Sequence, residues 1–125
     1  MSFDIHPDQL ARIRMMEDAQ SGRLGSLDTY IRKVSQWHRD RNLIDGSTDK
    51  DQALKLLQEL GELSDSICKG KDISDDIGDM LVVMINIAER NNLTLTHCLQ
   101  EAWMDIKDRK GKMVDGVFVK ESDYS

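Results

Sequence analysis

The sequence has little proline, cysteine or aromatic residue: its 125 residues include one proline, two cysteines and two each of tryptophan, tyrosine and phenylalanine. Because proline interrupts helices, a chain whose single proline is Pro7 can be helical for most of its length. Cys68 and Cys98 lack Cys-x-x-Cys spacing and have no histidine at ligand spacing, so neither a zinc site nor a redox motif is indicated. We expect two plain, partly buried thiols.

Long apolar runs and an excess of basic residues are also missing. No apolar run approaches the about 18 residues that span a bilayer, and the N-terminus lacks the basic start and apolar stretch of a signal peptide. Lys and Arg number 17 against 23 Asp and Glu, a formal net charge of -6, whereas general nucleic-acid binders need basic residues to contact phosphates. The sequence therefore predicts a cytoplasmic protein with neither a membrane nor a nucleic-acid partner.

The length of the chain predicts a single domain, 1–125, with one core that a second subunit would help to bury. We expect residues 1–25 to form an N-terminal extension, 27–112 a helical core and 113–125 a hairpin or tail. The fold class is all-α: a bundle of four to five helices with a short C-terminal β-hairpin.

Apolar residues at three- and four-residue spacing predict the individual helices. The expected ranges are about 7–19, 27–42, 49–68, 74–88 and 94–110, joined by breaks such as 21–25. Ser26, Thr48 or Ser47, Ser74, and Thr94 or Thr96 are the expected N-caps. Asp115-Gly116 between two apolar runs predicts a tight hairpin.

The fourth expected helix is apolar on nearly every face between Ile77 and Ala88. Such a helix must be surrounded, either by its own chain or by another subunit. We therefore expect a homo-oligomer, either a homodimer or a dimer of dimers. Asn86 is a polar exception within this helix, and it either fixes the register between helices or reaches a ligand.

Two segments in the most apolar helices share the pattern acid, aliphatic, glycine, acid: 59–62 and 76–79. Residues three apart share a helix face, so antiparallel pairing would gather Glu59, Glu62, Asp76 and Asp79. Either pair alone is commonly a solvated face, but the repeated pattern in an apolar setting favours a divalent cation, Mg²⁺ or its substitute Mn²⁺. Each glycine costs about 1 kcal/mol relative to alanine, which predicts close helix approach at that point.

These residues resemble the MazG-like all-α nucleoside triphosphate pyrophosphohydrolases, a family recognised by an ExxE motif, a variable spacer and an ExxD motif. Glu59-x-x-Glu62 matches the first motif, whereas Asp76 stands where the family usually has glutamate and has a shorter reach. Asp72-x-x-Asp75 offers a second, weaker register. Segments 52–63 and 105–113 are also similar, and the resemblance covers about 27–120.

The resemblance implies hydrolysis of a nucleoside or deoxynucleoside triphosphate to the monophosphate and pyrophosphate, in a house-cleaning role for the nucleotide pool. It implies Mg²⁺ held by Glu59, Glu62, Asp76 and Asp79, with one of the glutamates accepting a proton from water. Two alternatives stay open. One is a phosphoribosyl-ATP pyrophosphohydrolase, and the other is a non-catalytic module whose acidic pairs bind a structural cation or a basic protein.

A nucleoside triphosphate also needs cationic contacts for its phosphates and an aromatic contact for its base. The basic candidates are Lys55, one turn before Glu59, and Lys107, Arg109 and Lys110 near the end of the fifth helix, where cations also suit the helix dipole. The candidates for stacking on the base are Trp37, with His38 beside it, and Trp103, although aromatic residues at helical spacing are more often part of a core.

Overall fold

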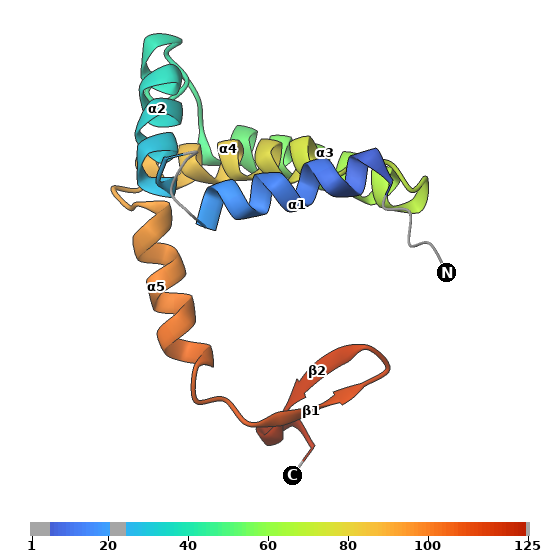
Figure 1. Cartoon of the computed structure of the whole chain (residues 1–125). Coiled ribbons are helices and arrows are strands. Elements are labelled where there is room, and N and C mark those ends of the chain that lie inside the picture. The colour runs from blue at the N-terminus through green and yellow to red at the C-terminus, as the bar shows by residue number, and fades with distance from the viewer. Residues whose placement is uncertain (1–5, 21–24, 125) are drawn as a thin grey trace.

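The computed structural model of the chain describes residues 6–20 and 25–124, which form five α-helices followed by a two-stranded antiparallel sheet (Figure 1). The elements in chain order are α1 (Pro7–Gln20), α2 (Leu27–Asp40), α3 (Asp49–Cys68), α4 (Ser74–Arg90), α5 (Leu95–Ile106), β1 (Gly111–Val114), β2 (Val117–Lys120) and the short 3-10 helix η1 (Glu121–Asp123). The predicted helical chain with a C-terminal hairpin is confirmed. The expected break at 21–25 lies, except for Gly25, outside the described residues.

Three helices begin at the capping residues that the sequence predicts. The side chains of Ser26, Thr48 and Thr94 each accept a hydrogen bond from the backbone N–H three residues later, at 3.1 to 3.2 Å. These bonds satisfy N–H groups that have no acceptor within the helix. Of the paired alternatives, Thr48 and Thr94 are therefore the caps.

Two of the predicted helix boundaries are wrong. Ser74 does not cap α4, because its backbone N–H and hydroxyl both bond to Oδ1 of Asp72, each at 2.9 Å, and Ile73 is the residue that precedes the helix. The side chain of Asp72 thus makes a local turn of the kind that aspartate favours. The fifth helix ends at Ile106 rather than Lys110, since the chain turns there and enters β1 at Gly111.

The predicted hairpin is confirmed at its turn. Val114 pairs with Val117 and Gly111 with Lys120, which leaves Asp115 and Gly116 as a two-residue loop. Their φ angles are +49° and +81°, the left-handed backbone that this kind of hairpin loop requires and that Asp-Gly adopts readily.

The helices pack unequally. Contacts between α3 and α4 are the most extensive, α2 packs on α4, and α5 touches α4 only near its start before extending away with the hairpin (Figure 1). The core consists of Ile31 from α2 and Val83, Ile85 and Ala88 from α4. A four- to five-helix bundle is therefore only partly formed within one chain, since α5 does not lie along the others.

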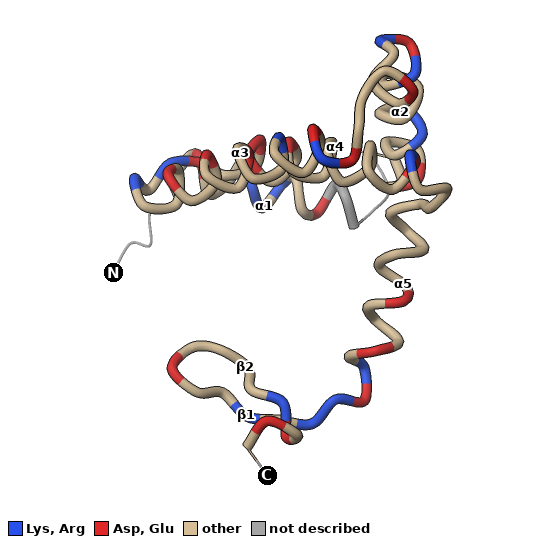
Figure 2. Tube along the Cα trace, turned by 180° about the vertical axis from the view of Figure 1, so that it is seen from behind, with Lys and Arg blue, Asp and Glu red and all other residues tan. Residues whose placement is uncertain are grey.

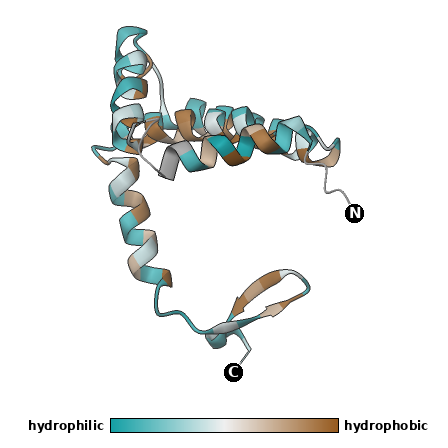
Figure 3. Cartoon of the chain, in the orientation of Figure 1, coloured by the Kyte–Doolittle hydropathy of each residue, from teal (hydrophilic) through white to brown (hydrophobic). Residues whose placement is uncertain are grey.

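Apolar side chains remain exposed on the outlying elements. Figure 3 shows hydrophobic residues on parts of α5 and on both strands. The exposed apolar side chains of the single chain include Leu99, Trp103, Met104 and Phe118. Burial of these residues by a second subunit stays a prediction. Within 6–20 and 25–124, no helix has the length and apolar character that a membrane crossing requires.

Gly61 and Gly78 do not mark a close approach between helices of this chain, so that expectation is wrong. A Cβ atom added at either position meets no heavy atom within 4 Å. The conformational free-energy cost of a glycine in a helix does not depend on whether another helix lies beside it. The sequence alone therefore could not show that the helix surfaces at Gly61 and Gly78 are open.

Candidate metal centre

A cluster of three carboxylates forms where α4 folds back along α3. The short connection 69–73 brings the start of α4 against the second half of α3, and the two helices pack closely. Glu59 and Glu62 share a face of α3 because they are three residues apart, and Asp79 comes from α4. One oxygen from each of the three lies within 4.8 Å of the others. The structure thus gathers three of the four predicted ligands.

Glu59 is the buried member of the cluster, with 6% of its surface exposed. Its Oε1 lies 3.2 Å from Nζ of Lys55, one turn earlier on α3. Its Oε2 is buried and has no hydrogen-bond partner among the described residues. A buried carboxylate oxygen without a donor is costly, so this oxygen has the character expected of a ligand for a cation.

Hydrogen bonding and burial, with electrostatic repulsion added to them, raise the pKa values of Glu62 and Asp79. Hydrogen bonding to Glu59, which only a protonated carboxyl can provide, and then the negative charge of Glu59 raise the pKa of Glu62. Burial raises the pKa of Asp79, and the charges of Asp75, Glu59 and Asp76 raise it further. The charged forms of these two carboxyl groups are therefore disfavoured, and a bound cation would favour them.

Asp76 stands beside the cluster rather than in it. Its negative charge raises the pKa values of both Glu62 and Asp79, so it is close to them, but none of its oxygens belongs to the group within 4.8 Å. The sequence already marks Asp76 as the ligand with the shorter side chain. A contact from Asp76 to a bound ion stays a prediction.

A pocket beside the cluster joins Asp79 to a candidate base-stacking residue. It has a volume of about 450 Å³ and is lined by Lys33, Val34, Trp37, Asp79 and Val82. Trp37 is 45% exposed, and the guanidinium of Arg41 lies over its ring, 4.3 Å from the centroid. Sequence reasoning missed Lys33, although it lies four residues before Trp37 and so shares its helix face.

His38 and Asn86 are buried and do not line the pocket at Trp37. The ring of His38 meets that of Trp37 edge-on, with centroids 5.6 Å apart. Asn86 is fully buried, and its Nδ2 donates to the carbonyl of Leu43 at 3.1 Å, which ties α4 to the connection between α2 and α3. The Oδ1 of Asn86 has no hydrogen-bond partner among the described residues, and contact of Asn86 with a ligand stays a prediction.

The candidates on α5 and after it lie apart from the acidic cluster within one chain. Figure 2 shows basic residues gathered between α5 and β1, away from α3 and α4. Arg109 pairs with Asp105 at 2.6 Å, and Lys107 lies 3.7 Å from Asp108. Lys110 lines a separate open pocket with Arg109, and Trp103 is exposed on α5. Contact of these residues with a substrate stays a prediction.

Comparison with known proteins identifies a phage relative. No family model matches the chain, and no solved structure matches it. Over 72 residues, 56% of this chain, it is 40% identical to the "Uncharacterized 18.2 kDa protein in rep-hol intergenic region" of Haemophilus phage HP1 (strain HP1c1). The matched region is 44% of that protein, so the chain spans less than half of its relative. The chain is thus similar to part of a phage protein whose name describes no activity, and none of these comparisons points to a MazG-like protein.

Proposed function

We propose that this protein is a Mg²⁺-dependent nucleoside triphosphate pyrophosphohydrolase, which converts a nucleoside or deoxynucleoside triphosphate and water to the monophosphate and pyrophosphate. The observation that carries the proposal is the cluster of Glu59, Glu62 and Asp79, whose oxygens lie within 4.8 Å of one another. The resemblance of the two acidic segments to the MazG-like enzymes supplies the reaction. The proposal includes a cytoplasmic, homo-oligomeric protein that removes unwanted nucleotides.

The residues present fit a hard divalent cation. The three donors are all carboxylate oxygens, which suit Mg²⁺ or Mn²⁺ rather than a metal that prefers sulfur or imidazole. Oε2 of Glu59 is buried without a hydrogen-bond partner among the described residues, and neighbouring carboxylates contribute to the raised pKa values of Glu62 and Asp79. Glu59, Glu62 and Asp79 would therefore hold the ion, with Asp76 beside them.

The remaining groups of the site have separate roles in the proposal. Bound Mg²⁺ offsets the charge of a triphosphate and lowers the pKa of a coordinated water. One of the two glutamates accepts the proton of the attacking water. Lys55, whose ammonium reaches the edge of the cluster at Glu59, contacts a phosphate oxygen. Trp37 provides a face for the base in the pocket that it shares with Asp79.

A substrate panel tests this proposal. The full chain is incubated with each common NTP and dNTP and with phosphoribosyl-ATP, with Mg²⁺ present or chelated, and products are separated by anion exchange. We expect monophosphate and pyrophosphate in equal amounts from nucleoside triphosphates, only with Mg²⁺. Selective turnover of phosphoribosyl-ATP would favour the biosynthetic enzyme. Binding of Mg²⁺ without any product would favour the non-catalytic module, and either result would contradict the proposal.

A further inference from the structure

A second pocket opens at the other end of α4, between α2, the last turns of α4 and the start of α5. Its volume is about 240 Å³. Glu89, on its wall, lies ten residues beyond Asp79 on α4, about 15 Å along the helix axis at the α-helical rise. The pocket is therefore separate from the acidic cluster, and neither the sequence motifs nor the proposed reaction uses it.

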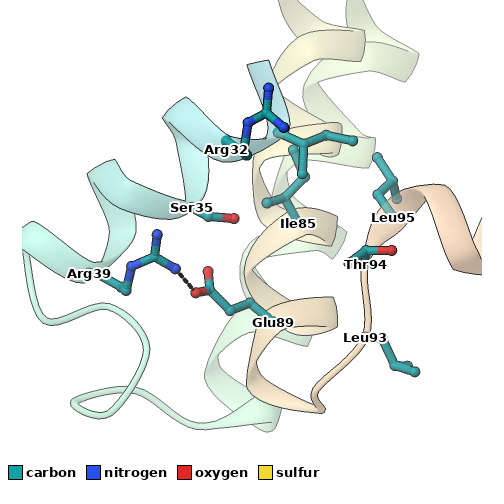
Figure 4. Close-up of a pocket in the computed structure, with 9 residues that line it drawn as sticks. Arg32, Ser35, Arg39, Ile85, Glu89, Leu93, Thr94 and Leu95 are labelled. Atoms are coloured by element: carbon teal, nitrogen blue, oxygen red, sulfur yellow. Dashed lines mark hydrogen bonds and ion pairs between the residues drawn. The ribbon is translucent and has the colours of Figure 1, made fainter. Parts of the chain in front are cut away.

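The carboxylate of Glu89, on the wall of this pocket, has one oxygen whose hydrogen bonding is incomplete. Figure 4 shows the carboxylate directed from α4 toward α2, where the guanidinium of Arg39 bonds to Oε1. Oε2 is buried and has no hydrogen-bond partner among the described residues. An unsatisfied buried oxygen is costly, and the oxygens of a carboxylate only accept hydrogen bonds. The group that completes this site must therefore be a hydrogen-bond donor.

The charges around the pocket favour a donor that is neutral. Arg39 and Glu89 form an ion pair without net charge, and the second arginine on the wall, Arg32, is exposed. A cationic donor would lie near the guanidinium that already neutralises Glu89, whereas an anion would be repelled by Oε2. A neutral N–H group meets neither penalty.

The other walls fit a small apolar body. The apolar side chains that line the pocket are Ile31, Ile85, Leu93 and Leu95. Ser35 adds a hydroxyl, which can donate a hydrogen bond to a carbonyl oxygen. The pocket is smaller than the about 300–1,000 Å³ of sites for drug-sized ligands, so it suits a molecule with little more than one ring.

We propose that this pocket binds a small neutral carboxamide whose body is an apolar ring. The amide N–H donates to Oε2 of Glu89, the hydroxyl of Ser35 donates to the amide carbonyl, and the apolar side chains contact the ring. This site is independent of the proposed hydrolysis, because it shares no residue with the acidic cluster.

Calorimetric titration of the metal-free full chain with benzamide and with N,N-dimethylbenzamide tests this inference. The second compound keeps the ring and the carbonyl but has no N–H. We expect one benzamide per chain, bound about tenfold more tightly than the dimethyl compound, because a hydrogen bond to a charged acceptor is lost. In Glu89→Leu this preference should disappear, since the acceptor is gone. Benzoate and benzylammonium should both bind the wild type more weakly than benzamide.

A pair of serine variants tests the place of binding without changing Glu89. Ser35→Phe fills the pocket from α2 and should abolish benzamide binding. Ser64→Phe makes the same change on the exposed surface of α3, outside the pocket, and should bind like the wild type. If circular dichroism shows that Glu89→Leu does not fold, these two variants decide the question.

Four results would overturn the inference. They are no saturable binding of benzamide, a preference for benzamide that persists in folded Glu89→Leu, equal binding by Ser35→Phe and Ser64→Phe, and benzoate or benzylammonium binding as tightly as benzamide. Glu62→Gln separates this site from the proposed function, because it should bind benzamide like the wild type even if it abolishes hydrolysis. Loss of benzamide binding in that variant, with an unchanged circular dichroism spectrum, would also contradict the inference.

Discussion

Nζ of Lys55 lies 3.2 Å from Oε1 of Glu59, while the other oxygen of Glu59 is buried and has no hydrogen-bond partner in the described chain. Lys55, on the same helix, thus provides a partner for one of the two oxygens of this buried carboxylate. In our account, a divalent cation is the missing partner of the other oxygen.

Lys55→Met should destabilise the metal-free protein by about 1–2 kcal/mol, because it leaves Glu59 buried without its single cationic partner. Urea unfolding gives this difference in the free energy of unfolding. Lys69→Met is the matched control, since Lys69 and Asp65 form a pair of the same spacing at 2.8 Å, with both side chains exposed. That control should change stability by less than about 0.5 kcal/mol. Equal effects of the two substitutions would contradict the prediction.

Mg²⁺ should raise the melting temperature of the wild type, because it binds the folded cluster and not the unfolded chain. At about 100 times the dissociation constant the stabilisation is about 2.7 kcal/mol. Glu62→Gln removes one repelling charge, so it should melt higher than the wild type without metal and respond less to Mg²⁺. Differential scanning fluorimetry with and without chelator measures both effects, with Asp65→Asn as the control. A Glu62→Gln variant that responds to Mg²⁺ like the wild type would exclude Glu62 as a ligand.

The contribution of His38 to stability should fall as the pH drops below about 6.5, whereas the raised pKa values of Glu62 and Asp79 act in the opposite direction. Burial lowers the pKa of His38, although the charge of Glu89 partly opposes this effect. The unfolded chain therefore binds a proton at a higher pH than the folded chain, and stability present above about pH 6.5 is lost as the pH falls through the folded pKa. Urea unfolding between pH 7.5 and 5.5 measures this slope. His38→Gln should lack the part of this slope that His38 contributes, and an equal slope in the wild type and the variant would contradict the assignment.

Trp37→Ala should raise KM for the nucleotide by about 5- to 150-fold, since stacking of a base on an aromatic ring contributes about 1–3 kcal/mol. Steady-state kinetics on the best substrate of the panel provide the value. Trp37→Phe keeps an aromatic face in the pocket beside Asp79 and should recover most of the affinity. If Trp37→Ala kept the wild-type KM for every nucleotide, the base would not lie in this pocket.

The features that the sequence predicts correctly are those that depend on neighbouring residues. The caps at Ser26 and Thr48 and the loop at Asp115 need only a few residues of local backbone. The acidic cluster is nearly as local, because Glu59 and Glu62 share a helix face and a short connection returns the chain to Asp79.

The features that the sequence did not reveal depend on how distant helices cross. The pocket that joins Lys33 to Asp79 exists because α2 packs on α4. The pairing of Arg39 with Glu89 joins residues 50 positions apart, and no local pattern marks it. The direction of α5 depends on few contacts with α4, so its apolar spacing correctly predicted a helix but could not place that helix along the others.

The most direct test of the central claim compares pyrophosphate release by the wild type, Glu59→Gln, Asp79→Asn and Asp65→Asn with the best nucleotide and saturating Mg²⁺. The account predicts full activity in the wild type and Asp65→Asn, and a loss of about a hundredfold or more in Glu59→Gln and Asp79→Asn, because each removes a carboxylate ligand. Wild-type turnover in Glu59→Gln or Asp79→Asn, or full wild-type activity with Mg²⁺ chelated, would contradict it.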